Sequence, residues 1–117
     1  MTDKLTDATI KLLACYSSRT PSQLKAGGFT HTDEFTSWLR AAYEDDSFLC
    51  GGDFISVFER CRSKDIFTLT FDETRACITY LVRQMRFESE PYPSITDGTL
   101  FDLLIHCLEL TSKEENI

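Results

Sequence analysis

Residues 99–110 form the most apolar stretch of this chain. The apolar positions of this stretch are Leu100, Phe101, Leu103, Leu104, Ile105, Cys107, Leu108 and Leu110. At helical spacing they cover well over half the circumference, and a helix that is apolar nearly all round is buried by its neighbours. We therefore predict that the most buried helix of the fold lies at this end of the chain. Its narrow polar stripe would be Asp102, His106 and Glu109.

Four other segments repeat apolar residues at the helical period of 3.6. They cover residues 6–16, 33–44, 53–62 and 70–87. The last of them opens with Thr70-Phe71-Asp72-Glu73, the pattern of a capping box, in which the first and fourth residues satisfy each other's free backbone N–H groups. Thr32 stands where the 33–44 segment needs an N-cap. These segments and the 99–110 stretch predict an all-α fold of about five helices.

The rest of the chain reads as connecting segments. Gly, Pro and Ser residues mark loops between the helices, and residues 66–70 could form a short extended segment. We find no repeat and no linker long enough to separate two domains. The sequence therefore predicts one compact domain over residues 1–111, followed by a polar tail over residues 112–117.

Charge and cysteine content exclude several classes of protein. The 117 residues carry 19 acidic and 12 basic side chains, for a net charge of −7. Binding to nucleic acid gains most of its affinity from basic groups that meet phosphates, so neither nucleic acid nor an anionic membrane is an expected partner. The five cysteines are odd in number and form no Cys-x-x-Cys pair, which argues against a disulfide framework or a zinc site. With no signal peptide recognisable, we expect a cytoplasmic protein with free thiols.

Two short motifs suggest metal chemistry, but simpler interpretations account for them. Gly51-Gly52-Asp53-Phe54 shares three residues with the signature of cyclases that make cyclic di-GMP, yet the second acid is missing, and a turn with Asp53 as N-cap explains the pattern. His31 with Asp33 and Glu34 could hold a metal, but adjacent side chains at a helix start diverge. No nucleotide-binding or hydrolase signature occurs. We therefore expect no metal and no cofactor.

The 70–87 segment carries the most informative polar feature. At 100° per residue, Arg75, Thr79, Arg83 and Arg86 fall on one strip, opposite the apolar stripe. Arginine recognises carboxylates and phosphates in a planar, bidentate way. The strip could bind an anionic partner, it could pair internally with Glu88 or with the acidic cluster at residues 44–46, or its arginines could simply be solvated.

Asp102 and His106 form a second candidate, since they stand four residues apart on the 99–110 segment. A carboxylate at that spacing could orient the imidazole for acid–base work. The simpler interpretation is a solvated polar stripe.

Two blocks of the sequence resemble a known family. Residues 81–88, Leu-Val-Arg-Gln-Met-Arg-Phe-Glu, and residues 97–104, Asp-Gly-Thr-Leu-Phe-Asp-Leu-Leu, are similar to a small family of bacterial and phage-borne helical domains without an assigned activity. That family carries an Arg-x-x-Arg-Phe block before a Gly-opened, Leu-rich last helix. The resemblance implies a helical fold and draws attention to Arg83 and Arg86, but Glu90 and Asp53-Phe54 depart from the family's pattern.

Two functions remain open from the sequence. The first is a non-enzymatic interaction or regulatory domain of bacterial or phage type, with a protein partner or a second copy of itself. The second is a small enzyme or ligand binder that acts on an anionic compound at Arg83 and Arg86. Arg75, Asp102 and His106 are the supporting site residues in either case.

Overall fold

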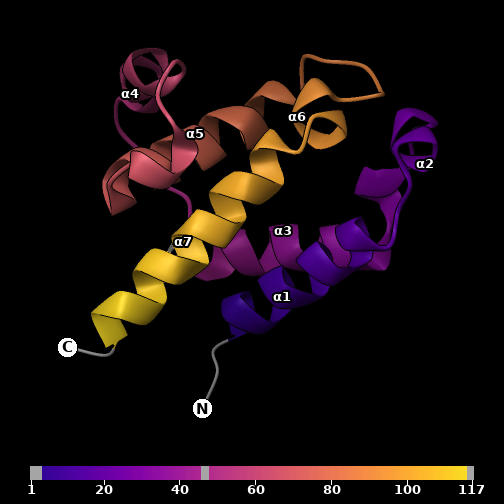
Figure 1. Ribbon diagram of the computed structural model, residues 1–117, viewed down its shortest axis with the longest axis horizontal. Coiled ribbons are helices and arrows are strands. Elements are labelled where there is room, and N and C mark those ends of the chain that lie inside the picture. Colours follow the sequence, from indigo (N-terminus) through magenta and orange to yellow (C-terminus); the bar gives the residue numbers. More distant parts are fainter. Residues whose placement is uncertain (1–3, 46–47, 116–117) are drawn as a thin grey trace.

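All regular secondary structure in the described part of the chain is helical. The computed structural model describes residues 4–45 and 48–115 (Figure 1). The α-helices are α1 (Lys4–Ser17), α2 (Pro21–Lys25), α3 (Asp33–Asp45), α4 (Phe54–Cys61), α5 (Phe71–Gln84), α6 (Pro93–Thr96) and α7 (Thr99–Glu115), and the 3-10 turns are η1 (Phe29–His31) and η2 (Ile66–Thr68). The all-α prediction is confirmed, although residues 4–45 and 48–115 hold seven α-helices where the sequence predicted about five.

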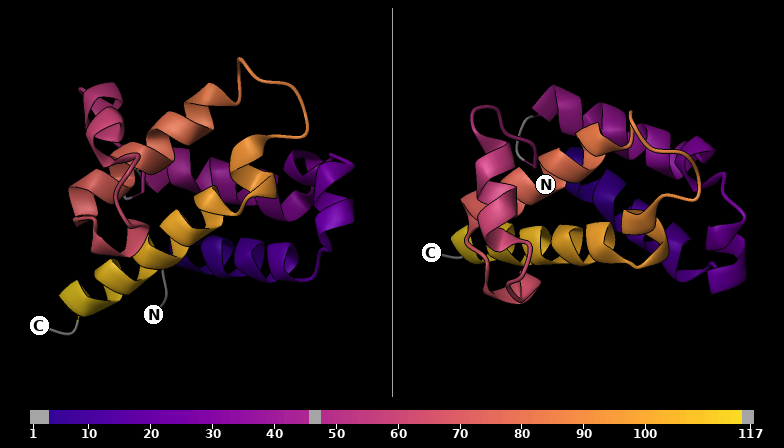
Figure 2. Two further views of the ribbon diagram at one scale, coloured as in Figure 1. Left: turned by 45° about the horizontal axis from the view of Figure 1, so that its top comes forward. Right: turned by 90° about the horizontal axis from the view of Figure 1, so that it is seen from above.

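Helix α7 crosses between two pairs of helices (Figures 1 and 2). Helices α1 and α3 pack on each other to form one pair, and α4 and α5 form the other. Helix α7 contacts α1 on one side and α5 on the other, and α6 leads directly into it. This arrangement leaves the outer face of each pair open to solvent.

Aromatic stacking in the core joins the first helix, α1, to the last helix, α7. The rings of Tyr16 on α1 and Phe101 on α7 stack with centroids 3.8 Å apart, and Phe29 meets Phe101 edge-on at 5.5 Å. Trp38 on α3 and Ile78 on α5 are fully buried. Burial of one such side chain contributes about 1.5–3 kcal/mol to the stability of the folded state, so these residues are a main source of the stability of this fold.

The two additional helices are short and begin with proline. Pro21 opens α2 and Pro93 opens α6, where the missing N–H is not needed and the fixed φ suits a first turn. Thr20 and Gln23 form a capping box at the start of α2. From the sequence, Pro21 predicted a loop here, because proline also ends helices.

Several predicted boundaries differ from the structure. Residues 66–68 form the turn η2 rather than an extended segment, because the Asp65 carboxylate accepts a hydrogen bond from the N–H of Phe67 at 3.0 Å and favours a turn. Helix α5 ends at Gln84, not at residue 87. Helix α7 continues to Glu115, so the backbone of residues 112–115 is helical, and residues 116–117 lie outside the described part of the chain.

The last helix is well buried, but α5 is equally so. Each of the two helices has six buried residues among those described. The expectation that the C-terminal helix is the most buried one is thus not confirmed. None of the helices in residues 4–45 and 48–115 has the length and apolar character that a membrane crossing requires.

Candidate functional site

The C-terminal turns of α5 and the first turn of α4 form one exposed surface of mixed character. It comprises Phe54, Ile55, Arg83, Arg86 and Phe87, and we call it the arginine–phenylalanine patch. These residues surround a shallow hollow of about 260 Å³, which Tyr80 and Gln84 also line. The patch therefore combines two guanidinium groups with three apolar side chains.

Local sequence explains how each half of the patch is positioned. The Asp53 carboxylate accepts a hydrogen bond from the N–H of Ser56 at 3.2 Å and caps α4, which fixes Phe54 and Ile55 at the start of that helix. Hydrogen bonds from the Ser56 side chain and from the Ser56 backbone N–H lower the pKa of Asp53. After Gln84 the chain turns through bonds of 3-10 type, in which the N–H of Phe87 reaches the Gln84 carbonyl at 2.9 Å.

The two halves of the patch meet through ring and guanidinium contacts. The Arg83 guanidinium lies 5.1 Å from the centre of the Phe54 ring, which is within the range of a cation–π interaction. Below it, the rings of Phe58 and Tyr80 stack at 3.9 Å with 8° between their planes. These two contacts hold the start of α4 against the end of α5.

Neither exposed arginine is neutralised within the described residues. No carboxylate oxygen there lies within 4.0 Å of the guanidinium of Arg83 or Arg86. Glu44, one of the acids considered as an internal partner, instead pairs with Lys4 at 3.2 Å. Asp46, another of those acids, lies outside the described residues. The two positive charges are available to an external anionic group.

Phe87 is the most exposed large apolar residue of the described chain. Its exposed fraction is 83%, and Ile55 across the hollow is 55% exposed. Isolated exposed apolar residues are common, but a group of them beside unpaired arginines is the composition that protein interfaces favour.

Arg75 and Thr79, predicted to share the strip, have a structural role. An Nη2 hydrogen of Arg75 is donated to the Leu49 carbonyl at 2.7 Å, and the Thr79 hydroxyl oxygen accepts from the N–H of Cys50 at 2.9 Å. Both bonds attach the segment before α4 to the middle of α5. The strip is thus divided, with its first half covered by this segment and its second half exposed.

Asp102 and His106 are not hydrogen-bonded to each other in the described chain. Asp102 is exposed, whereas His106 is only 5% exposed, so the expectation of a solvated polar stripe is wrong for His106. Its Nε2 lies 2.8 Å from the Leu69 carbonyl and its Nδ1 has no partner within the described chain. Asp102 lies near Tyr16, whose pKa is raised by burial and by this carboxylate.

The motifs considered for metal binding have other roles. Asp53 caps α4, as the simpler interpretation predicted. The His31 Nε2 atom lies 3.8 Å from Oε1 of Glu90, and Oε2 of the same carboxylate accepts from the N–H of Gly28 at 2.6 Å. Among the described residues, no three His, Cys, Asp or Glu side chains gather as metal ligands would.

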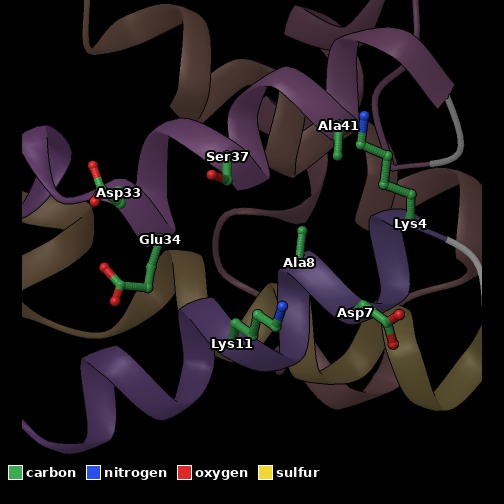
Figure 3. Close-up of a pocket in the computed structure, with 8 residues that line it drawn as sticks. All are labelled: Lys4, Asp7, Ala8, Lys11, Asp33, Glu34, Ser37 and Ala41. Atoms are coloured by element: carbon green, nitrogen blue, oxygen red, sulfur yellow. The ribbon is translucent and has the colours of Figure 1, made fainter.

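Two larger hollows lie elsewhere. One, of about 600 Å³, is a groove between α1 and α3 (Figure 3). The other, of about 570 Å³, lies between α4, α5, α6 and α7 and is lined by the buried thiols of Cys61 and Cys77. Burial raises the pKa of Cys77 to about 12, so this thiol is protonated and not a nucleophile at neutral pH.

The apolar half of the patch was not predicted from the sequence. The helical period over residues 53–62 places Phe54 on an apolar stripe, and the predicted 70–87 helix includes Phe87. One local signal was present for Phe87: Arg83 and Gln84 stand four and three residues before it, at positions where a buried helical residue has apolar neighbours.

Comparison with known proteins identifies no relative: no family model, curated protein or solved structure matches this chain.

Proposed function

We propose that this protein is a non-enzymatic interaction domain. In this proposal, the arginine–phenylalanine patch binds a protein segment that carries carboxylates around an apolar anchor. The observation that carries the proposal is the pair of exposed arginines, unneutralised by any described carboxylate, beside the 83% exposed Phe87.

Charge explains why the expected partner is an acidic peptide. A chain with net charge −7 repels most anionic partners at long range, so a local pair of arginines selects a short segment over an extended polyanion such as nucleic acid. Arginine binds carboxylates in bidentate geometry, and burial of Phe87 and Ile55 supplies the apolar part of the binding energy.

The proposal also includes a cytoplasmic location and a bacterial or phage origin. The thiols of the five cysteines are free, which suits a reducing cytoplasm. Arg83, Arg86 and Phe87 also form the Arg-x-x-Arg-Phe block of the bacterial and phage-borne family that the sequence resembles. A regulatory role within that family would be fulfilled by binding, without a reaction.

A synthetic peptide pair tests this function. The first peptide carries a tryptophan between four glutamates, and the second replaces the glutamates with glutamines. We expect the acidic peptide to shift the backbone NMR signals of Ile55, Arg83 and Phe87 in the ¹⁵N-labelled protein, and the glutamine peptide to shift them far less. Shifts spread evenly over the surface, or equal for the two peptides, would refute the proposal.

Matched variants make the test specific. Arg83→Gln and Arg86→Gln should each weaken peptide binding by about tenfold, which corresponds to one lost charge-assisted contact of about 1.4 kcal/mol. Arg40→Gln, an exposed arginine on α3 outside the patch, should bind as the parent protein does. Arg86→Gln and Arg40→Gln should keep the parent's melting temperature, because neither arginine is in an ion pair within the described chain. Arg83→Gln should lower it slightly, because this variant also loses the contact with the Phe54 ring.

A second candidate function is binding of a small anion. A separate hollow of about 280 Å³ lies on the other side of Arg83, and Tyr43, Cys50 and Gly51 help to line it. The Tyr43 hydroxyl and the Arg83 guanidinium at this hollow suit a phosphate or carboxylate group. A titration with inorganic phosphate that shifts the signals of Tyr43 and Gly51, but not that of Phe87, would favour this function over peptide binding.

A further inference from the structure

The groove between α1 and α3 has rims of opposite charge. We call it the α1–α3 groove. The residues that line it are Lys4, Asp7, Ala8 and Lys11 from α1, and Asp33, Glu34, Ser37 and Ala41 from α3. Its volume is about 600 Å³, and its floor holds the small side chains, so that the backbones of both helices can be approached closely.

The two helices run antiparallel, which fixes the charges that face each other. At one end, the ammonium of Lys4 pairs with Glu44 at 3.2 Å. At the other end, Lys11 on α1 lies across the groove from Glu34 on α3 (Figure 3). The α1 rim therefore carries a lysine at each end with Asp7 between them, and the α3 rim carries carboxylates at the Lys11 end.

The charges at this second end are not used within the described chain. Lys11, Asp33 and Glu34 form no ion pair within 4.0 Å there. Figure 3 shows the Lys11 ammonium directed toward Ala8 and the Glu34 carboxylate directed the other way. The Lys11 and Glu34 side chains thus lie on opposite sides of the groove and are not paired with each other.

We propose that the occupant of the α1–α3 groove is a second copy of this chain. A two-fold axis that runs parallel to the groove places the α1 rim of one copy on the α3 rim of the other, at the same level along the groove. Lys11 of each copy then meets Glu34 and Asp33 of its partner. The symmetry makes this contact twice.

Charge complementarity favours a second copy over another kind of partner. A uniformly acidic or basic segment would be attracted by one rim and repelled by the other, whereas the two-fold arrangement matches both rims at once. The arginine–phenylalanine patch lies on the other helix pair, so self-association leaves it accessible.

Sedimentation velocity of the full chain over a range of concentrations tests the proposal. The parent protein should show a monomer–dimer equilibrium that shifts toward monomer at high salt. Lys11→Glu alone and Glu34→Lys alone should each raise the dimer dissociation constant by about tenfold, because each change replaces two attractions by two repulsions. Lys25→Glu, on α2 and outside the groove, should change it little.

An equimolar mixture of the two single variants provides the decisive measurement. In the mixed dimer, the unchanged Lys11 of one variant meets the unchanged Glu34 of the other. The second contact joins the two introduced side chains, a glutamate and a lysine, so both contacts become attractive again. The mixture should therefore dimerise at concentrations where each variant alone does not.

Two outcomes would overturn the proposal. If the two charges interacted only within one chain, mixing would restore nothing, and the mixture would fail to dimerise. The other outcome is a parent protein that stays monomeric at about 1 mM. Neither result bears on peptide binding at the arginine–phenylalanine patch, which is measured separately.

Discussion

Replacement of Gly27 by alanine tests how the chain holds the turn between α2 and η1. Gly27 and Gly28 adopt left-handed backbone angles, with φ of +85° and +86°. A Cβ atom on Gly27 would overlap the Oε2 atom of Glu90, whereas a Cβ on Gly28 would meet nothing within 4 Å. The two substitutions therefore share the backbone strain and differ only in the contact with Glu90.

The difference between the two variants follows from the hydrogen bonds of Glu90. A left-handed φ destabilises the folded state of an alanine variant by about 1–2 kcal/mol. Alanine also reduces the conformational entropy of the unfolded chain, which offsets about 0.4–1 kcal/mol of this loss. Gly28→Ala should thus lower the free energy of unfolding by about 1 kcal/mol. In Gly27→Ala the carboxylate must also move from the Gly28 N–H and from the Thr30 hydroxyl, which it binds at 2.6 and 3.1 Å. Loss of these bonds adds about 1–2 kcal/mol.

Urea denaturation of both variants measures this difference directly. We expect Gly27→Ala to be less stable than Gly28→Ala by about 1–2 kcal/mol. In a Glu90→Ala background the overlap is absent, so Gly27→Ala should then lower stability by about the same amount as Gly28→Ala. Equal stabilities of the two variants with Glu90 present would refute the assignment of Glu90 as the group that fixes this turn.

Two further predictions concern the capping box and the thiols. Thr70→Ala should lower the free energy of unfolding by about 0.5–2 kcal/mol in urea denaturation, because the Thr70 hydroxyl oxygen accepts from the N–H of Glu73 at 3.2 Å. The N–H of Thr70 donates a hydrogen bond to Glu73 and lowers the pKa of this carboxyl in the folded state. The ionised carboxylate therefore stabilises the fold at pH values above its unfolded pKa, and this stabilisation is lost as the pH falls through its folded pKa. In Glu73→Gln the free energy of unfolding should decline less steeply as the pH is lowered. A thiol reagent should modify Cys50, which is partly exposed, before Cys77 and Cys107, whose pKa values burial raises to about 12; equal native rates for Cys50 and Cys77 would contradict the burial.

The helical fold could be predicted because its signals are local. The Thr70 and Glu73 capping box lies where the sequence pattern placed it, and the Thr32 hydroxyl oxygen accepts from the N–H of Phe35 at 3.2 Å, as an N-cap does. The burial of His106 could not be predicted in this way. Its partner, the carbonyl of Leu69, lies 37 positions away in the sequence, and helical periodicity carries no information about such a contact.

The candidate site was predictable in part for the same reason. Helical spacing placed Arg83 and Arg86 on one face, and the structure shows both of them exposed. Spacing alone could not separate Arg75 from them, because the segment that covers Arg75 comes from Leu49, 26 positions earlier. The apolar half of the patch depends on how α4 folds back onto α5, which is likewise a tertiary property.

Because α4 is short, the half of the patch on α4 is less stably folded than the half on α5. Among its eight residues only Cys61 is buried, and α5 is its principal neighbour. A helix with so few buried contacts opens at a lower free energy than the core around it. Phe54 and Ile55 travel with α4 in such an opening, while Arg83 and Arg86 stay with α5. In the proposed interaction, the arginine charges that are already in place would meet the partner first, and Phe54 and Ile55 would then close over its apolar anchor.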